Sequence, residues 1–236
     1  MIKIIHEDDV LLVATKPAGL ATLAKPGGIA SLSEELVKMR PELGEIPDNG
    51  IAHRLDNDTS GIICIGKTTK TYENLRSQFA EGTARKHYTA LVLGGTPDHE
   101  TIEAPIAHHP RKKTKMVVCE SSDRAEELKA RPAHTTYSVA QRYLLGDTAY
   151  TLLDVVIASG VRHQIRAHLA WIGFPLSGDE LYQNTKKRAE DVLPVKRHFL
   201  HASKLEINHP TTGDRIFLES KLPDDLSKIL EQASPV

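Results

Sequence analysis

The feature that most constrains this chain is a charged loop that leads directly into an apolar run. His53 to Gly61 combines basic, acidic, amide and hydroxyl side chains with a glycine, and Ile62 to Ile65 follows at once. A loop in this position places a carboxylate close to an apolar interior. Arg54 lies two residues from Asp56, and a nearby guanidinium keeps a carboxylate ionised. The alternative is a surface turn with incidental ion pairs, which contribute little free energy.

A second polar stretch, from Ser159 to Leu169, is predicted to connect a strand to a helix. The helix is expected over 163–172, before Gly173. Arg162 and Arg166 are four residues apart near its start. Like charges at this spacing, at the positive end of a helix, are unfavourable by a few tenths of a kcal/mol. A carboxylate or a phosphate nearby would remove that cost, whereas a solvent-exposed basic turn would tolerate it.

Local patterns predict strands and helices in mixed order, which indicates an α+β fold and not a regular βαβ alternation. Ser31 and Glu34 form a capping-box pattern before a helix that Pro41 should end. The other expected elements are a strand over 10–14, a helix over 69–81 ended by Gly82, a strand over 86–93, two strands within 139–158 around Gly146-Asp147, a hairpin of 205–207 with 216–218, and a helix over 224–232.

Composition describes an ordinary globular protein of one large domain or two small ones. The chain has 236 residues, a formal net charge of −1 and two cysteines. The near-zero charge argues mildly against a dedicated nucleic-acid-binding protein, although a local basic face can still steer RNA. No apolar stretch approaches the roughly 20 residues of a membrane span, and the N-terminus lacks a signal-peptide core. We therefore expect no membrane association and a cytoplasmic location.

The twelve histidines do not indicate a metal site. His198 and His201 are three residues apart and His163 and His168 are five apart, but no third ligand stands at a diagnostic spacing. There is no glycine-rich phosphate loop and no dinucleotide fingerprint. We expect neither a metal nor a cofactor.

The string His-Arg-Leu-Asp-x-x-Thr-Ser-Gly, at 53–61, resembles the signature of the RluA-type pseudouridine synthases, which isomerise uridine in RNA. Lys16-Pro17-x-Gly19 is similar to a motif near the start of these enzymes. The resemblance implies a single catalytic domain over 1–236 with a mixed, largely antiparallel β-sheet core and flanking helices. It also implies a stand-alone, monomeric protein, without the N-terminal S4-like RNA-binding domain of many relatives.

The stretch after Gly160 resembles the second long motif of this family. The matching residues are Gly160, His163, Gln164, Ile165, Arg166, Gly173, Pro175, Gly178, Asp179 and Tyr182. Val161 departs from the family pattern, which has arginine there, and Arg162 stands in the next position. Tyr88, in Lys86-x-Tyr88-x-Ala90, is similar to the active-site tyrosine of the family, although a lone tyrosine on a strand is more often a core residue.

The resemblance implies roles for ten residues. Asp56 would be the catalytic aspartate, Arg166 the arginine that pairs with it, and Tyr88 the residue against the flipped base. Seven others are expected to contact the RNA substrate: His53, Arg54, Thr59, Arg162, His163, Gln164 and Ile165.

The implied reaction breaks the C–N glycosidic bond of a uridine and forms a C–C bond at C5. Asp56 would either attack C1′ or remove a proton from C2′. The sequence leaves open whether structured ribosomal or transfer RNA is modified. A catalytically silent RNA-binding protein and a nucleoside glycosidase remain as other functions.

The polar segment from His108 to Pro132 is a further candidate for substrate contact, because Arg111, Lys112 and Lys113 form a basic cluster within it. A solvated polar loop explains the same composition equally well.

Overall fold

The computed structural model describes residues 2–158 and 160–236. The chain divides into two compact units, which we describe separately. The first comprises Met1–Lys86 and His201–Lys221, and the second comprises His87–Leu200 and Leu222–Val236. The expected single catalytic domain over the whole chain stays a prediction.

The first unit is built on strands that are mostly antiparallel. Strand β2 (Leu11–Lys16) pairs with β1 (Lys3–Glu7) on one side and β3 (Ser60–Gly66) on the other, both antiparallel. Strand β3 then pairs in parallel with β10 (Leu200–Asn208), and β10 forms an antiparallel hairpin with β11 (Arg215–Glu219). Every residue of β3 is buried, as the apolar run after the charged loop predicts.

Two α-helices of the first unit begin and end where their capping residues predict. Helix α1 (Leu32–Met39) starts with the expected capping box of Ser31 and Glu34. Helix α2 (Thr69–Glu81) ends at Gly82, which has the left-handed conformation of a C-cap. The short helices η1 (Pro41–Glu45) and η2 (Pro47–Gly50) lie between α1 and β3 in the sequence. Apolar side chains of β2, β3, α2 and β10 share one core cluster.

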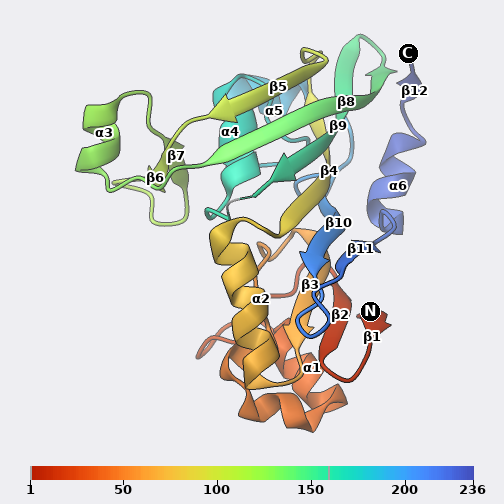
Figure 1. The fold of residues 1–236 in the computed structure, drawn as a ribbon. Coiled ribbons are helices and arrows are strands. Elements are labelled where there is room, and N and C mark those ends of the chain that lie inside the picture. Colours follow the sequence, from red (N-terminus) through yellow and green to blue (C-terminus); the bar gives the residue numbers. More distant parts are fainter. Residues whose placement is uncertain (1, 159) are drawn as a thin grey trace. The chain divides into compact units, whose positions relative to one another are not determined.

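The second unit has a sheet in the order β4 (Arg85–Leu93), β9 (Thr148–Ile157), β8 (His134–Leu145) and β12 (Ser234–Pro235). Strand β5 (His99–Glu103) also pairs with β8. A separate hairpin joins β6 (Ile106–His108) to β7 (Met116–Val118). Figure 1 shows this hairpin and helix α3 (Ser122–Glu127) together near the start of β8.

The other helices of this unit are α4 (Gln164–Trp171), α5 (Thr185–Glu190) and α6 (Asp224–Leu230). Leu226 and Ile229 of α6 pack into a cluster with Leu91, Tyr150 and Phe199.

The arrangement confirms the predicted α+β class with its mixed, mainly antiparallel sheet. Within the described residues, five strands had no sequence prediction: β1, β5, β6, β7 and β12. The polar segment 108–132 is also more structured than a solvated loop, since it contains β7 and α3. Among the described residues, no helix combines the length and apolarity that crossing a membrane requires.

Candidate active site

The loop that carries Asp56 is fastened by backbone hydrogen bonds on both sides of that residue. Lys16 is buried, and its Nζ donates to the carbonyl oxygens of Pro17, Leu20 and Asn57 at 2.9, 2.8 and 2.7 Å. These bonds use the three donors of an ammonium group. Gly19 N donates to the same Asn57 oxygen at 3.0 Å. The residue after Asp56 is therefore held by the turn that follows β2.

The residue before Asp56 is held by a reciprocal pair of bonds. Thr22 Oγ1 donates to Leu55 O at 2.8 Å, and Leu55 N donates back to Thr22 Oγ1 at 3.1 Å. Both residues are buried, so water does not compete for these bonds. The half-buried Asp56 is thus presented by a backbone fixed at both neighbours.

Gly61 ends this loop at a place where only glycine fits. Its φ is +128°, and a Cβ there would lie 2.3 Å from Ala202 O. Ala202 is its partner in the parallel pairing of β3 with β10. Beside it, Ser60 Oγ lies 2.9 Å from Nδ1 of His201, in a buried pair. The close approach of the two strands explains the glycine after Thr59-Ser60.

His53 packs against the protein interior. Its ring lies 4.3 Å from the ring of Phe79, and its Nε2 accepts a hydrogen bond from Cys64 N at 3.1 Å. Burial, with a smaller contribution from the charge of Lys86, lowers the pKa of His53 to about 3. The imidazole is therefore neutral at pH 7. Its Nδ1 is buried and has no hydrogen-bond partner among the described residues.

The two other substrate residues expected in this loop differ in exposure. Thr59 is buried, and its backbone N donates to Asp56 O at 3.1 Å, which closes the turn. Arg54 is exposed. RNA contact by these residues and by His53 stays a prediction.

In the second unit, helix α4 begins with a strained residue. His163 has a φ of +54°, an unusual value for a residue that is not glycine. Gln164 reinforces this start, because its Oε1 accepts from Val161 N at 3.1 Å and its Nε2 donates to His134 O at 2.9 Å. Gln164 and Ile165 are both buried, and so is Val161, where the family pattern has arginine.

Arg166 projects from α4 into a buried ion pair with Asp179. Its Nε lies 2.7 Å from Oδ2 and its Nη2 lies 2.9 Å from Oδ1, a bidentate geometry that uses two of its five donors. The side chain of Asp179 is 1% exposed and that of Arg166 9%. Asp179 thus fixes the direction of the guanidinium. Asp56 belongs to the first unit, and its predicted pairing with Arg166 stays a prediction.

Asp191 organises the turn that supplies Asp179. Its carboxylate accepts from Gly178 N at 2.8 Å, Ser177 Oγ at 2.8 Å and Gln183 Nε2 at 2.6 Å. The Tyr150 hydroxyl lies 3.1 Å from it. Three of these four groups belong to residues 177–183, which flank Asp179 in the sequence.

Tyr182 connects the β6–β7 hairpin to the start of α4. Its Oη accepts from Met116 N at 2.9 Å and lies 3.1 Å from His163 Nδ1. Lys115 Nζ lies 4.9 Å and Arg166 Cζ 5.2 Å from its ring centroid, both within cation–π distance. Tyr182 therefore contacts both the hairpin and Arg166.

The remaining predicted site residues are Arg162 and Tyr88. Arg162 is exposed and donates to Lys113 O and Thr114 O of the hairpin turn, both at 3.4 Å. Tyr88 lies on β4 and is 6% exposed. Its predicted role against a flipped base stays a prediction.

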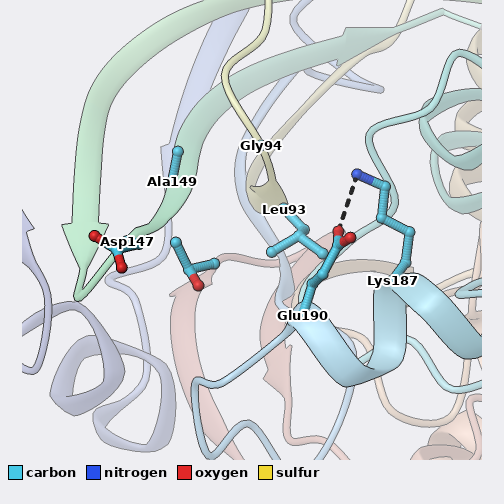
Figure 2. Close-up of a pocket in the computed structure, with 7 residues that line it drawn as sticks. Leu93, Gly94, Asp147, Ala149, Lys187 and Glu190 are labelled. Atoms are coloured by element: carbon cyan, nitrogen blue, oxygen red, sulfur yellow. Dashed lines mark ion pairs between the residues drawn. The ribbon is translucent and has the colours of Figure 1, made fainter.

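Figure 2 shows a pocket of the second unit. It is lined by Leu93, Gly94, Asp147, Thr148, Ala149, Lys187 and Glu190. Lys187 and Glu190, both on α5, form an ion pair 3.5 Å long on one side of it. None of the predicted site residues lines this pocket, so it adds nothing to the candidate site.

Comparison with known proteins decides the family. A family model described as RNA pseudouridylate synthase matches residues 10–171, which include the Asp56 loop and α4. The chain belongs to the RNA pseudouridylate synthase family. This confirms the resemblance seen in the motifs.

Individual pseudouridylate synthases are similar over nearly the whole chain. The "Ribosomal large subunit pseudouridine synthase D" of Nitrosomonas europaea is 38% identical over 234 residues, which are 98% of this chain and 64% of that protein. An "Uncharacterized RNA pseudouridine synthase" of Chloroflexus aurantiacus is 37% identical over 221 residues, 92% of this chain and 65% of that protein. The chain thus spans somewhat less than two thirds of the length of these two curated relatives.

A solved structure of the family has the same fold. "Human RNA Pseudouridylate Synthase Domain Containing 1" superposes with a TM-score of 0.79 and 24% identity, covering 100% of this chain and 89% of that one. At this identity the likeness concerns the fold alone.

The sequence does not indicate the contacts of several residues that shape this synthase-family site. Lys16 and Asp179 were recognised within motifs, but their bonds to Asn57 O and Arg166 were not predicted. Asp191 had no signal in the sequence. No group of three or more potential metal ligands occurs within residues 2–158 and 160–236.

Proposed function

We propose that this chain isomerises uridine to pseudouridine in RNA of the large ribosomal subunit. The observation that carries the proposal is the 38% identity, over 98% of the chain, to a protein named ribosomal large subunit pseudouridine synthase D. Relatives with the same name in Neisseria meningitidis and Xanthomonas campestris are both 34% identical. Ribosomal RNA is accordingly favoured over transfer RNA as the substrate.

In the proposed mechanism, Asp56 is the catalytic residue and acts in its ionised form at the ribose of the target uridine. It either attacks C1′, which breaks the glycosidic C–N bond directly, or removes the C2′ proton, after which the bond to the base is eliminated. The detached uracil turns and its C5 bonds to C1′, which breaks the Asp56–C1′ ester in the first route and is accompanied by return of a proton to C2′ in the second. Loss of the C5 proton then completes either route. The backbone bonds on either side of Asp56 support this role, because a preorganised group loses little freedom on binding substrate.

Arg166 is proposed to keep the carboxylate of Asp56 ionised, and Tyr88 is proposed to contact the flipped base. The bidentate bond to Asp179 supports the role of Arg166, since it keeps a cationic side chain extended in one direction within a buried environment. A uridine must leave the base stack to reach such a site, at a cost of a few kcal/mol. Phosphate contacts elsewhere on the protein would offset that cost.

The turn between β6 and β7 is the proposed source of those contacts. Arg111, Lys112 and Lys113 are exposed at its tip. No carboxylate in the described part of the chain pairs with any of the three. Replacing all three with serine should weaken RNA binding and lower its salt dependence by up to three phosphate contacts. Unchanged affinity would show that the turn does not bind the substrate.

The proposed activity is tested by tritium release from RNA labelled at uridine C5, measured on separate ribosomal and transfer RNA pools. Release from large-subunit ribosomal RNA, with pseudouridine as product, supports the proposal. Release from transfer RNA alone would contradict the substrate class. Free uracil as product would indicate a glycosidase, and binding without release would indicate a silent RNA-binding protein. The cytoplasmic location and monomeric state remain part of the proposal.

A further inference from the structure

Two turns of this protein, one in each unit, are built around a histidine in the same way. In His109-Pro110-Arg111-Lys112, Nδ1 of the histidine accepts hydrogen bonds from Arg111 N at 3.1 Å and Lys112 N at 3.2 Å. In His209-Pro210-Thr211-Thr212, Nδ1 accepts from Thr211 N at 3.3 Å and Thr212 N at 3.1 Å. Each imidazole thus holds the amides two and three residues further along the chain.

This geometry defines the state of both imidazole rings. A ring nitrogen that accepts hydrogen bonds carries no proton, so each ring carries its proton on Nε2. In the second turn the Nε2 of His209 lies 3.1 Å from Asp8 Oδ2, to which it donates. The Asp8 contact ties the His209 turn into the first unit, whereas the His109 turn lies at the tip of a hairpin.

The His109 turn is also closed by its own backbone and by Arg162, which precedes α4 in the sequence. His109 N donates to Lys115 O at 3.0 Å, and Lys115 N donates to Lys112 O at 2.9 Å. The guanidinium of Arg162 donates to the carbonyls of Lys113 and Thr114. The backbone of residues 109–115, which we call the basic turn, is therefore held at both ends and at its centre.

The basic turn combines a fixed backbone with exposed cationic side chains. His109 is half-buried, while Arg111, Lys112 and Lys113 are exposed. A turn that is already ordered loses less conformational entropy when its side chains bind phosphates than a flexible loop does. The imidazole supplies the order at the two residues, 111 and 112, whose side chains start the basic cluster.

We infer that His109 is a positioning residue that holds the basic turn in its RNA-binding conformation through Nδ1. The inference rests on the proposed role of this turn in binding RNA. His109 need not touch the RNA: its part is to accept from the Arg111 and Lys112 amides, which sets the spacing of the cations.

The acceptor position can be tested atom by atom with substitutions at residue 109. Asparagine places its Oδ1 where histidine has Nδ1 and forms the same type of turn, also before proline. Glutamine places its amide one atom further out, near the position of Nε2, and alanine removes the acceptor. His109→Asn should therefore keep the turn, whereas His109→Ala and His109→Gln should lose it.

The experiment measures the KM and kcat for a large-subunit ribosomal RNA transcript, together with the salt dependence of RNA affinity. We expect KM to rise about tenfold for His109→Ala and His109→Gln, the effect of about 1.4 kcal/mol of added ordering cost. The change should fall on KM and not on kcat, and His109→Asn should stay within about twofold of wild type. His209→Ala is the matched control, since it opens the same kind of turn away from the basic cluster.

The possible outcomes distinguish a failure of this inference from a failure of the proposal that the basic turn binds RNA. If neutralising Arg111, Lys112 and Lys113 raises KM but His109→Ala does not, the positioning role is wrong and the basic turn still binds RNA. If His109→Asn is as impaired as His109→Ala, the Nδ1 acceptor is not the reason for the histidine, and the inference fails. If neither the triple variant nor His109→Ala changes KM, the turn does not bind RNA. The proposed RNA contact of the turn and the positioning role of His109 are then both wrong.

Discussion

At the scale of single residues, several charged side chains of this protein act on its backbone and on one another inside the fold. The ammonium group of Lys16 donates to three carbonyl oxygens. The carboxylate of Asp191 accepts hydrogen bonds from four side-chain or backbone groups, and that of Asp179 is bound to Arg166. A buried charge is tolerated only when such bonds replace its hydration. The charged residues of the motifs therefore stabilise the site as well as being candidates for its chemistry.

The Arg166–Asp179 pair gives a direct test of this view. Asp179→Asn removes the negative charge and leaves the guanidinium of Arg166 buried without it, so the free energy of unfolding should fall by about 3 kcal/mol. Asp225→Asn is the matched control, because Asp225 also pairs with an arginine, Arg197, but is 56% exposed. That control should lose less than about 1 kcal/mol in the same urea titration. Equal losses in the two variants would show that burial of the pair is unimportant.

His53 should make stability depend on pH below neutrality. Its pKa is about 3 in the folded protein against an ordinary 6.5, so the unfolded chain binds more protons between these values. Stability is then fully present above pH 6.5 and falls as the pH decreases, by about 2 kcal/mol between pH 7 and pH 5.

The measurement compares urea unfolding of wild type and His53→Gln at pH 7 and pH 5. Glutamine keeps an acceptor for Cys64 N but does not titrate, so the difference in stability between the two proteins should change by that amount in favour of the variant. A difference that is the same at both pH values would mean that the ring protonates freely in the fold.

At the scale of elements, the close contact of β3 and β10 should tolerate little added bulk. Gly61→Ala places a methyl group against Ala202 O in a backbone conformation unfavourable for alanine, and we expect a loss of at least about 3 kcal/mol in unfolding free energy. Gly95→Ala, at an exposed position with open space, should change stability by less than about 0.5 kcal/mol. Tolerance of Gly61→Ala would show that the strands can separate at this point.

Elements with strong local signals could be predicted from the sequence. The capping box at Ser31, the C-cap at Gly82 and the strand before Gly94 all depend on neighbouring residues, and the structure confirms them. Strand β5 (His-Glu-Thr-Ile-Glu) was missed because it is short and polar, and it forms by pairing with β8. Such a strand depends on its partner more than on its own propensity.

The sequence motifs name candidate site residues, but they do not indicate the contacts that these residues make. The motifs named Asp56, Arg166 and Tyr182. One of the three acceptors of Lys16 is a carbonyl 41 residues away, and the donor to Tyr182 is an amide 66 residues away. Every residue carries such backbone groups, so the sequence does not mark which of them will be bound. Only the folded chain selects them.

At the scale of the whole molecule, a net charge of −1 coexists with a local concentration of cations. The basic turn carries the exposed Arg111, Lys112 and Lys113, whereas cations such as Arg40, Arg142 and Arg215 are paired with carboxylates. A protein of this kind should bind RNA at a limited site, since its total charge gives little general attraction.

Whether Asp56 carries out the isomerisation of uridine can be measured as tritium release from C5-labelled large-subunit ribosomal RNA. Asp56→Asn should lower the single-turnover rate by on the order of a thousandfold or more while leaving RNA affinity nearly unchanged. Asp58→Asn, two residues along the same loop and exposed, is the matched control and should keep a rate close to wild type. Normal release by Asp56→Asn, or equal loss in both variants, would contradict the assignment.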